Sequence, residues 1–214
     1  MRFGVDEAGK GPVLGSMFAA AVACEPAALP EAVGDSKTIT PTRREALAAE
    51  IRDVASVGVA EITVDRIDDP QTDMNTLTVA AQAAALDRIG PEGLAGTVDA
   101  GDVDAARFGR RVAAGVDAEC TIEAAHGADE TNPLVGAASI VAKVERDAHV
   151  ERLASRHRPS YETIGSGYPS DPATRTFLAA YVEDHGELPA CARSSWSTCD
   201  DVLGANEQSG LDEF

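Results

Sequence analysis

Two acidic residues, Asp6 and Glu7, follow the first apolar segment and stand directly before a glycine loop, Gly9-Lys10-Gly11. Carboxylates at a strand end can hold a metal ion against a phosphate, because glycines let the backbone come close to a ligand. Neighbouring residues on a strand point to opposite faces, so both acids reach one site only if the strand ends there and the chain bends. The alternative is an acidic pair in a surface turn.

A third candidate acid, Asp99, follows the apolar segment 94–98. An apolar strand that ends in an acid is a usual ligand position in an open α/β sheet. Asp102 and Asp104 lie close behind and compete for this role, and both also suit an acidic surface. We favour Asp99 because it follows the strand directly.

A fourth candidate acid, Asp129, precedes a long segment of small apolar residues. Lys143 lies near the middle of that segment, and Ser139 falls one helical turn before it on the same face. Asp129 has the simpler interpretation of a helix-entry acid beside the positive end of the dipole, and Lys143 that of a solvated face. The interpretation of Lys143 as a surface residue is less favoured in this chain, because it has only three lysines. The other two, Lys10 and Lys37, also lie in candidate segments.

Four carboxylates that converge on a sheet edge would suit hard divalent cations, Mg²⁺ or Mn²⁺. Two such ions roughly 3.5–4 Å apart would activate a water and stabilise the leaving oxygen in phosphodiester cleavage. We therefore expect a metal-dependent enzyme of phosphodiester chemistry.

The charge of the chain is unusual. Its 214 residues hold 36 acids against 18 bases, a formal net charge of −18. Many acids with almost no lysine indicate a proteome adapted to molar salt, of the haloarchaeal type. Such a charge normally argues against nucleic acid as a partner. In molar salt the screening length falls to about 3 Å, so contacts at bonding distance decide binding and a nucleic-acid substrate stays open.

The elements that position these residues follow from periodicity and from cap residues. We expect strands over residues 2–6, 56–64, 94–99 and 117–123, with 13–24 as the hairpin partner of the first, and helices over 41–52, 73–89, 132–153 and 172–182. Early strands followed by alternating helices predict an α/β fold, with a central mixed sheet flanked by helices. From residue 198 onward the chain is acidic and nearly free of aromatics, which predicts a disordered tail.

The length suits one large domain, and no apolar run is long enough to span a membrane. The four cysteines are scattered without zinc spacing, so we expect free thiols. A soluble, cytoplasmic monomer is the simplest expectation.

The motifs taken together resemble one family. They are Asp6-Glu7-Ala8-Gly9-Lys10-Gly11-Pro12, Asp35-Ser36-Lys37, Val98-Asp99-Ala100, His126-Gly127-Ala128-Asp129 and the helix segment 137–147. In order and spacing over residues 1–198 they look like type 2 ribonuclease H, the archaeal ribonuclease HII. The resemblance implies a ribonuclease H-like fold over 1–198, with a C-terminal helical part at about 155–198, and a disordered tail at 199–214.

The resemblance also implies an activity and its site. The activity is hydrolysis of RNA in RNA/DNA hybrids and cleavage beside single ribonucleotides in duplex DNA, leaving 5′-phosphate and 3′-hydroxyl ends. The metal ligands and catalytic residues carried over are Asp6, Glu7, Asp99 and Asp129, holding two Mg²⁺ or Mn²⁺ ions.

Substrate contacts carry over as well. The backbone of Gly9, Lys10 and Gly11 would sense the ribose 2′-hydroxyl, and Tyr168 would stack on the following nucleotide. A simpler interpretation of Tyr168 is a loop tyrosine that closes a hydrophobic edge. The phosphate contacts would be Lys37, Ser139 and Lys143.

One departure concerns the glycine loop, because the family more often has arginine where this chain has Lys10. Lysine lacks the two-pronged geometry of arginine. The change is harmless if the loop acts through backbone amides, and it loosens the phosphate grip if the side chain acts. Arg193 with Trp196 resembles a C-terminal family segment and is assigned no role.

The last residues resemble the peptide by which replication enzymes bind the sliding clamp. Gln208 is followed by Leu211 and Phe214, which are three residues apart, so one short turn presents both to a groove. The usual second aromatic is missing, and an acidic tail with two apolar residues is the alternative.

Two other functions remain open on sequence. A DNA-directed nuclease or junction resolvase of the same superfold would use the same carboxylates, but it would not need the glycine loop or Tyr168. An acidic, cation-buffering scaffold would leave the placement of the three lysines unexplained.

Overall fold

The computed structural model describes residues 1–33 and 39–211, the last three of these by backbone only. Lys37 and Phe214, which the sequence singles out for phosphate and clamp binding, lie outside the described residues.

Five strands form one mixed sheet in the order β3-β2-β1-β4-β5. Their bounds are β1 Arg2–Ala8, β2 Met17–Cys24, β3 Ser56–Ile62, β4 Ala95–Asp99 and β5 Thr121–Ala125. Strand β2 is antiparallel to both β1 and β3, whereas β4 is parallel to β1 and to β5. The predicted α/β class with a mixed sheet is confirmed.

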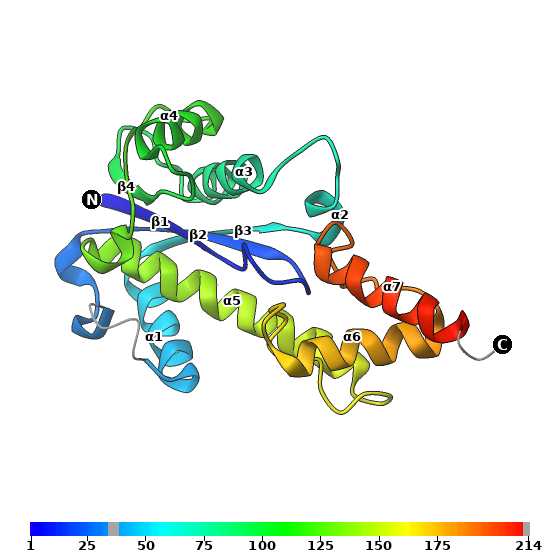
Figure 1. Ribbon diagram of the computed structural model, residues 1–214. Helices are drawn as coiled ribbons and strands as arrows, with labels where there is room; N and C mark the ends of the chain where they lie inside the picture. The colour runs from blue at the N-terminus through cyan, green and yellow to red at the C-terminus, as the bar shows by residue number, and fades with distance from the viewer. Residues whose placement is uncertain (34–38, 212–214) are drawn as a thin grey trace. The chain divides into compact units, whose positions relative to one another are not determined.

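Helices cover both faces of this sheet. Helices α3 (Met74–Asp87) and α4 (Ala105–Gly115) lie on one face, and α1 (Pro41–Val54) and α5 (Pro133–His157) lie on the other (Figure 1). Helix α5 approaches β1 so closely that a Cβ atom on Gly4 would lie 2.2 Å from the carbonyl carbon of Leu134. Only glycine fits there, so the first turn of α5 packs directly on β1.

The helix starts follow from capping, as the sequence predicts. The Thr40 hydroxyl accepts from the amide of Arg43 at 3.4 Å, and Pro41 is the first residue of α1. The Asp73 carboxylate accepts from the amides of Asn75 and Thr76, each at 2.9 Å, and starts α3.

The chain divides into two compact units. The sheet unit comprises Met1–Lys10, Met17–Ile62 and Thr72–Arg146, and the helical unit comprises Gly11–Ser16, Thr63–Gln71 and Asp147–Phe214. The helical unit contains α2 (Val64–Ile67), the end of α5, α6 (Pro172–His185) and α7 (Ser197–Leu211). Each unit has its own apolar core, with Phe177 and Leu178 at the centre of that in the helical unit.

The expectation of disorder from residue 199 is wrong for the described part of the tail, because α7 extends through Leu211. Cys199 and Val202 are buried in the core of the helical unit. Their spacing of three places both on one face of a helix, a weak apolar signal that the acidic composition conceals.

Helix α4 has no counterpart among the predicted elements. Asp104 caps its first turn through the amide of Arg107, and Phe108 and Val112 are buried one turn apart. The neighbouring strand β5 also begins four residues later than predicted.

The four cysteines are free thiols, as predicted. Among the described residues, no helix combines the length and the apolar character needed to cross a membrane.

Candidate active site

The four candidate carboxylates lie at the carboxyl ends of three adjacent parallel strands. In the β1–β4 pairing Val5 is opposite Val98, so the next step of the register places Asp6 beside Asp99. Strand β5 is the neighbour of β4 on the other side, and Asp129 lies in the short 3₁₀ helix η3 (Ala128–Glu130) that follows it. The carboxyl edge of a parallel sheet is where α/β folds place ligands.

Asp6 and Glu7 leave β1 on opposite faces. Asp6 is hydrogen-bonded to Ser139 of α5, and Glu7 Oε2 accepts from Gln82 Nε2 of α3 at 2.7 Å. These helices cover opposite faces of the sheet (Figure 1), as strand alternation requires. The expectation that the strand ends at Asp6 is wrong, because β1 continues through Ala8.

The carboxylates disfavour one another's charge. Burial, followed by the charges of Glu7 and Asp99, raises the pKa of Asp6 well above its ordinary value. Burial raises the pKa of Glu7 to about 6, and Asp99 adds to the rise while Gln82 and Lys10 oppose it. The pKa of Asp99 is also raised, first by burial and then by Asp129, although the Ala128 amide donates to its Oδ1 at 2.7 Å. This is a site with excess negative charge and raised proton affinity.

The donor set fits a hard divalent cation by chemistry, since it consists of carboxylate oxygens alone. As the side chains stand, no group of three His, Cys, Asp or Glu within the described residues converges closely enough to hold an ion.

The competing acids near Asp99 are engaged in local structure. Asp102 forms an ion pair with Arg107 at 2.7 Å, and the hydrogen bond from Arg107 lowers the pKa of Asp102. Asp104 caps α4. These partners favour Asp99 over both as the metal ligand.

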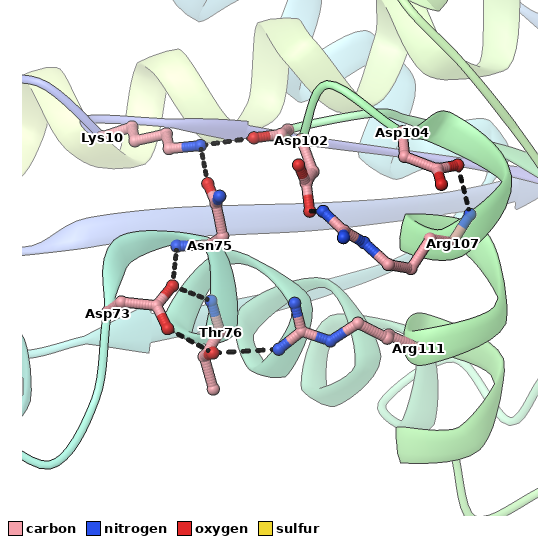
Figure 2. A network of polar contacts seen from close by, with 9 residues as sticks. Lys10, Asp73, Asn75, Thr76, Asp102, Asp104, Arg107 and Arg111 are labelled. Atoms are coloured by element: carbon pink, nitrogen blue, oxygen red, sulfur yellow. Dashed lines mark hydrogen bonds and ion pairs between the residues drawn. The ribbon is translucent and has the colours of Figure 1, made fainter.

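The glycine loop is tied to the neighbouring elements by the side chain of Lys10. Its Nζ donates to Asn75 Oδ1 of α3 at 3.0 Å and to the carbonyl of Gly101 at 2.5 Å (Figure 2). Gly9, with φ of 92°, adopts a backbone conformation that favours glycine. Because the Lys10 side chain is bonded to other residues of the protein, the arrangement favours substrate recognition through the backbone amides of the loop.

Tyr168 lies beside the other end of the glycine loop, within the helical unit. The carbonyl of Gly167 accepts from the amides of Val13 and Leu14, at 2.8 and 3.2 Å. A Cβ atom on Gly11 would lie 3.9 Å from the Tyr168 ring, and Tyr168 is 40% exposed. An exposed ring next to the loop suits stacking on a base.

The comparisons with known proteins agree with this geometry. A family profile described as Ribonuclease HII matches residues 3–199. The chain is a member of the ribonuclease HII family. Ribonuclease HII of Haloarcula marismortui is 69% identical over the full length of both chains, and that of Natronomonas pharaonis is 51% identical over 99% of this chain and 98% of its own. The predicted family and the predicted halophilic character are confirmed.

Solved structures of the family share the fold. Ribonuclease H2 of Pyrococcus horikoshii superposes with a TM-score of 0.85 at 35% identity, covering 96% of this chain and 98% of its own. The ribonuclease HII in a PCNA:RNase HII complex from Archaeoglobus fulgidus gives 0.83 at 37% identity, covering 94% and 96%. The ribonuclease H-like fold is confirmed, and the chain is a ribonuclease H, a divalent-metal-dependent hydrolase of RNA in RNA/DNA hybrids.

The two phosphate-binding candidates on α5 of this ribonuclease HII chain are connected to the carboxylates. Lys143 Nζ donates to Ser139 Oγ at 2.7 Å, and Ser139, which is fully buried, is hydrogen-bonded to Asp6. The pair therefore forms a short polar chain that leads from Lys143 to a candidate ligand.

Gln82 is a site residue that the sequence analysis missed. It is fully buried on α3 and contacts both Glu7 and the carbonyl of Asp99. The sequence feature that could have identified Gln82 is a long polar side chain among the small residues Ala81, Ala83 and Ala85, on a helix that covers the sheet.

The C-terminal candidates are described in part. Gln208 is exposed on α7, and Leu211 is the last residue of that helix. Arg193 is fully buried and donates to the carbonyl of Gly15 at 2.8 Å, with Trp196 5.1 Å from its guanidinium. These contacts give Arg193 a structural role inside the helical unit.

Proposed function

We propose that this ribonuclease H also cuts at single ribonucleotides embedded in duplex DNA, by two-metal-ion hydrolysis that leaves 5′-phosphate and 3′-hydroxyl ends. The observation that carries the proposal is the set of interacting carboxylates at the ends of β1, β4 and η3. Excess negative charge at a sheet edge is stabilised by bound cations and is otherwise unfavourable.

The site contains residues that would bind the metal ions and a residue that would orient one of these ligands. Asp6, Glu7, Asp99 and Asp129 would hold the ions, with Ser139 orienting Asp6. When bound, Mg²⁺ or Mn²⁺ would activate the attacking water and stabilise the leaving oxygen.

Selection of RNA would come from the glycine loop and from Tyr168. The backbone amides of Gly9, Lys10 and Gly11 suit contact with a ribose 2′-hydroxyl, which DNA lacks. Gly11 and Tyr168 are neighbours, which supports a shared recognition of the junction between ribonucleotide and deoxyribonucleotide. Lys143 would contact a phosphate of the bound duplex, as would Lys37, which lies outside the described residues.

The test is cleavage of labelled duplexes in molar KCl with Mg²⁺. One duplex carries a single ribonucleotide and its control is all DNA. We expect cleavage of the first duplex only, and its loss in Asp99→Asn and in Asp129→Asn. The matched control is Asp102→Asn, which breaks the pair with Arg107 and should retain cleavage.

The outcomes separate the candidate functions. Equal cleavage of both duplexes would favour a DNA-directed nuclease and contradict ribose recognition. Full activity in both Asp99→Asn and Asp129→Asn would contradict the carboxylate site.

We further propose that the C-terminal peptide binds the replication sliding clamp. Gln208 and Leu211 lie on or at the end of α7, and the structurally similar protein of Archaeoglobus fulgidus was solved as a PCNA:RNase HII complex. The full chain should bind the clamp in a pull-down at high salt, and Phe214→Ala should weaken that binding while leaving cleavage unchanged. Equal binding by the variant would contradict this assignment.

A further inference from the structure

Gln82 joins two of the strand ends that carry candidate metal ligands. Its Nε2 donates to Glu7 Oε2 at 2.7 Å and to the backbone carbonyl of Asp99 at 2.9 Å. We propose that Gln82 is a positioning residue that fixes the Glu7 carboxylate against the carboxyl end of β4 and so prepares the site for a divalent cation. This inference rests on the proposed metal-dependent function.

The orientation of the Gln82 amide follows from its partners. A carboxylate oxygen and a backbone carbonyl only accept, so the NH₂ end must face them. The other end, Oε1, is buried and has no hydrogen-bond partner among the residues that the structure describes. A buried, unpaired carbonyl is unfavourable, and an apolar side chain would pack there without that penalty. Packing alone therefore does not account for a glutamine at this position.

The surroundings of Glu7 show why a hydrogen bond from Gln82 matters for the position of its carboxylate. Its Oε1 would lie 3.3 Å from a Cβ atom on Gly101, so this side of the carboxylate faces a residue without a side chain. Lys10 contributes a favourable charge to Glu7, and its Nζ also donates to Asn75 and to Gly101. Gln82 is a neutral group that donates directly to Glu7 and also to the strand that bears Asp99.

Helix α3 acts as the support for this contact. Asn75, Thr78 and Gln82 follow at intervals of three and four, so they share one face of the helix. Along that face, Asn75 accepts from Lys10 and Gln82 donates to Glu7. Thr78 lies between them, and its hydroxyl donates to the carbonyl of Met74 of its own helix at 2.7 Å.

The test variant is Gln82→Met, which keeps the length of the side chain and removes its donor. We expect the affinity of the substrate-free protein for Mn²⁺ to fall about 10–100-fold, the usual effect of removing a group that orients a metal ligand. At saturating Mn²⁺ the KM for the ribonucleotide-containing duplex should stay unchanged. The metal-free protein should melt somewhat earlier than the parent, because the Glu7 carboxylate and the Asp99 carbonyl lose their shared donor.

Thr78→Val is the matched control. It converts another fully buried polar residue of α3 to an apolar one of similar shape, and it should leave the Mn²⁺ affinity unchanged. Calorimetric titration of Mn²⁺ into the full chain in molar KCl measures both variants. A Gln82→Met affinity within twofold of the parent, or an equal loss in Thr78→Val, would overturn the proposal.

A second measurement covers the case in which Gln82→Met does not fold. In the parent protein, the side-chain amide resonance of Gln82 should shift when Mg²⁺ is added, and its protons should exchange slowly. An unmoved resonance at saturating Mg²⁺ would overturn the proposal. A parent that binds Mn²⁺ but cuts no ribonucleotide-containing duplex would contradict the proposed function alone, since the titration needs no substrate.

Discussion

Carboxylates are used in opposite ways in the two units of the molecule. In the helical unit, Asp68 accepts hydrogen bonds from the amides and hydroxyls of Ser194 and Ser195, at 2.5 to 3.1 Å. Burial works against its charge, but these hydrogen bonds prevail and lower the pKa of Asp68. In the sheet unit, burial and then acidic neighbours raise the pKa of Asp6 and of Glu7, and the hydrogen bonds that these acids accept do not offset the rise.

The difference separates an acid with a structural role, Asp68, from the acids that we propose as metal ligands. Asp68 is a satisfied acceptor that connects the α2 region to the start of α7. The sheet-unit acids repel one another's charge in the protein alone, and a bound cation would relieve this repulsion. Substitution of a sheet-unit acid should therefore reduce cleavage and raise the stability of the metal-free protein. Substitution of Asp68 should lower stability and leave cleavage unchanged.

The largest expected effect comes from Asp99→Asn compared with Asp68→Asn. Removing the Asp99 charge should reduce cleavage at least about 10³-fold, roughly 4 kcal/mol, while the metal-free protein melts a few degrees higher. Asp68→Asn should leave cleavage unchanged and lower stability by about 1–2 kcal/mol, or roughly 2–8 °C, because hydrogen bonds to a partly exposed charge are lost. Thermal melting and initial cleavage rates measure the pair. Equal changes at both positions would remove the distinction.

A smaller effect is expected for Tyr168→Ala, which tests whether the helical unit contributes to recognition. Loss of one stacking ring is worth about 1–3 kcal/mol, so the preference for a single-ribonucleotide duplex should fall by roughly 5–150-fold. Affinity for Mn²⁺ should not change. Tyr161→Phe, which removes the hydroxyl that bonds to Asp184, is the control and should keep the preference. An unchanged preference in Tyr168→Ala would end the role of that ring.

The smallest effect is a pH dependence of stability. The pKa of Glu7 is raised from 4.5 to about 6, so the folded state binds the proton more tightly than the unfolded state. Stability of the metal-free protein should therefore rise by up to about 2 kcal/mol as pH falls from about 6.5 to 4.5. Glu7→Gln should flatten this slope, and saturating Mg²⁺ should do the same. Urea unfolding across that range, in molar KCl, measures it, and a metal-free slope of the opposite sign would contradict the environment assigned to Glu7.

The sequence revealed the acids but not how they are held. Asp99 was predictable because it directly follows an apolar strand, and the mixed sheet because strands precede alternating helices. The divergence of Asp6 and Glu7 was hidden by the assumption that the strand ends between them. The contacts of Ser139 and Gln82 depend on which helix covers which face, and local spacing does not contain that information.

Helices α4 and α7, which the sequence analysis did not predict, have physical explanations. Helix α7 is stabilised because the side chains of Cys199 and Val202 are buried in the apolar core of the helical unit. Helix α4 carries two buried side chains, Phe108 and Val112, on a largely polar helix. Tertiary burial decides both cases, and it overrides composition.

Anomalous diffraction from crystals soaked in Mn²⁺ tests most directly whether the four acids share metal ions. The account predicts anomalous peaks about 2.0–2.6 Å from carboxylate oxygens of Asp6, Glu7, Asp99 and Asp129, with Asp6 and Glu7 rotated toward one another. Peaks confined to other acids, such as Asp102 or Asp68, or the absence of any peak at saturating Mn²⁺, would contradict it.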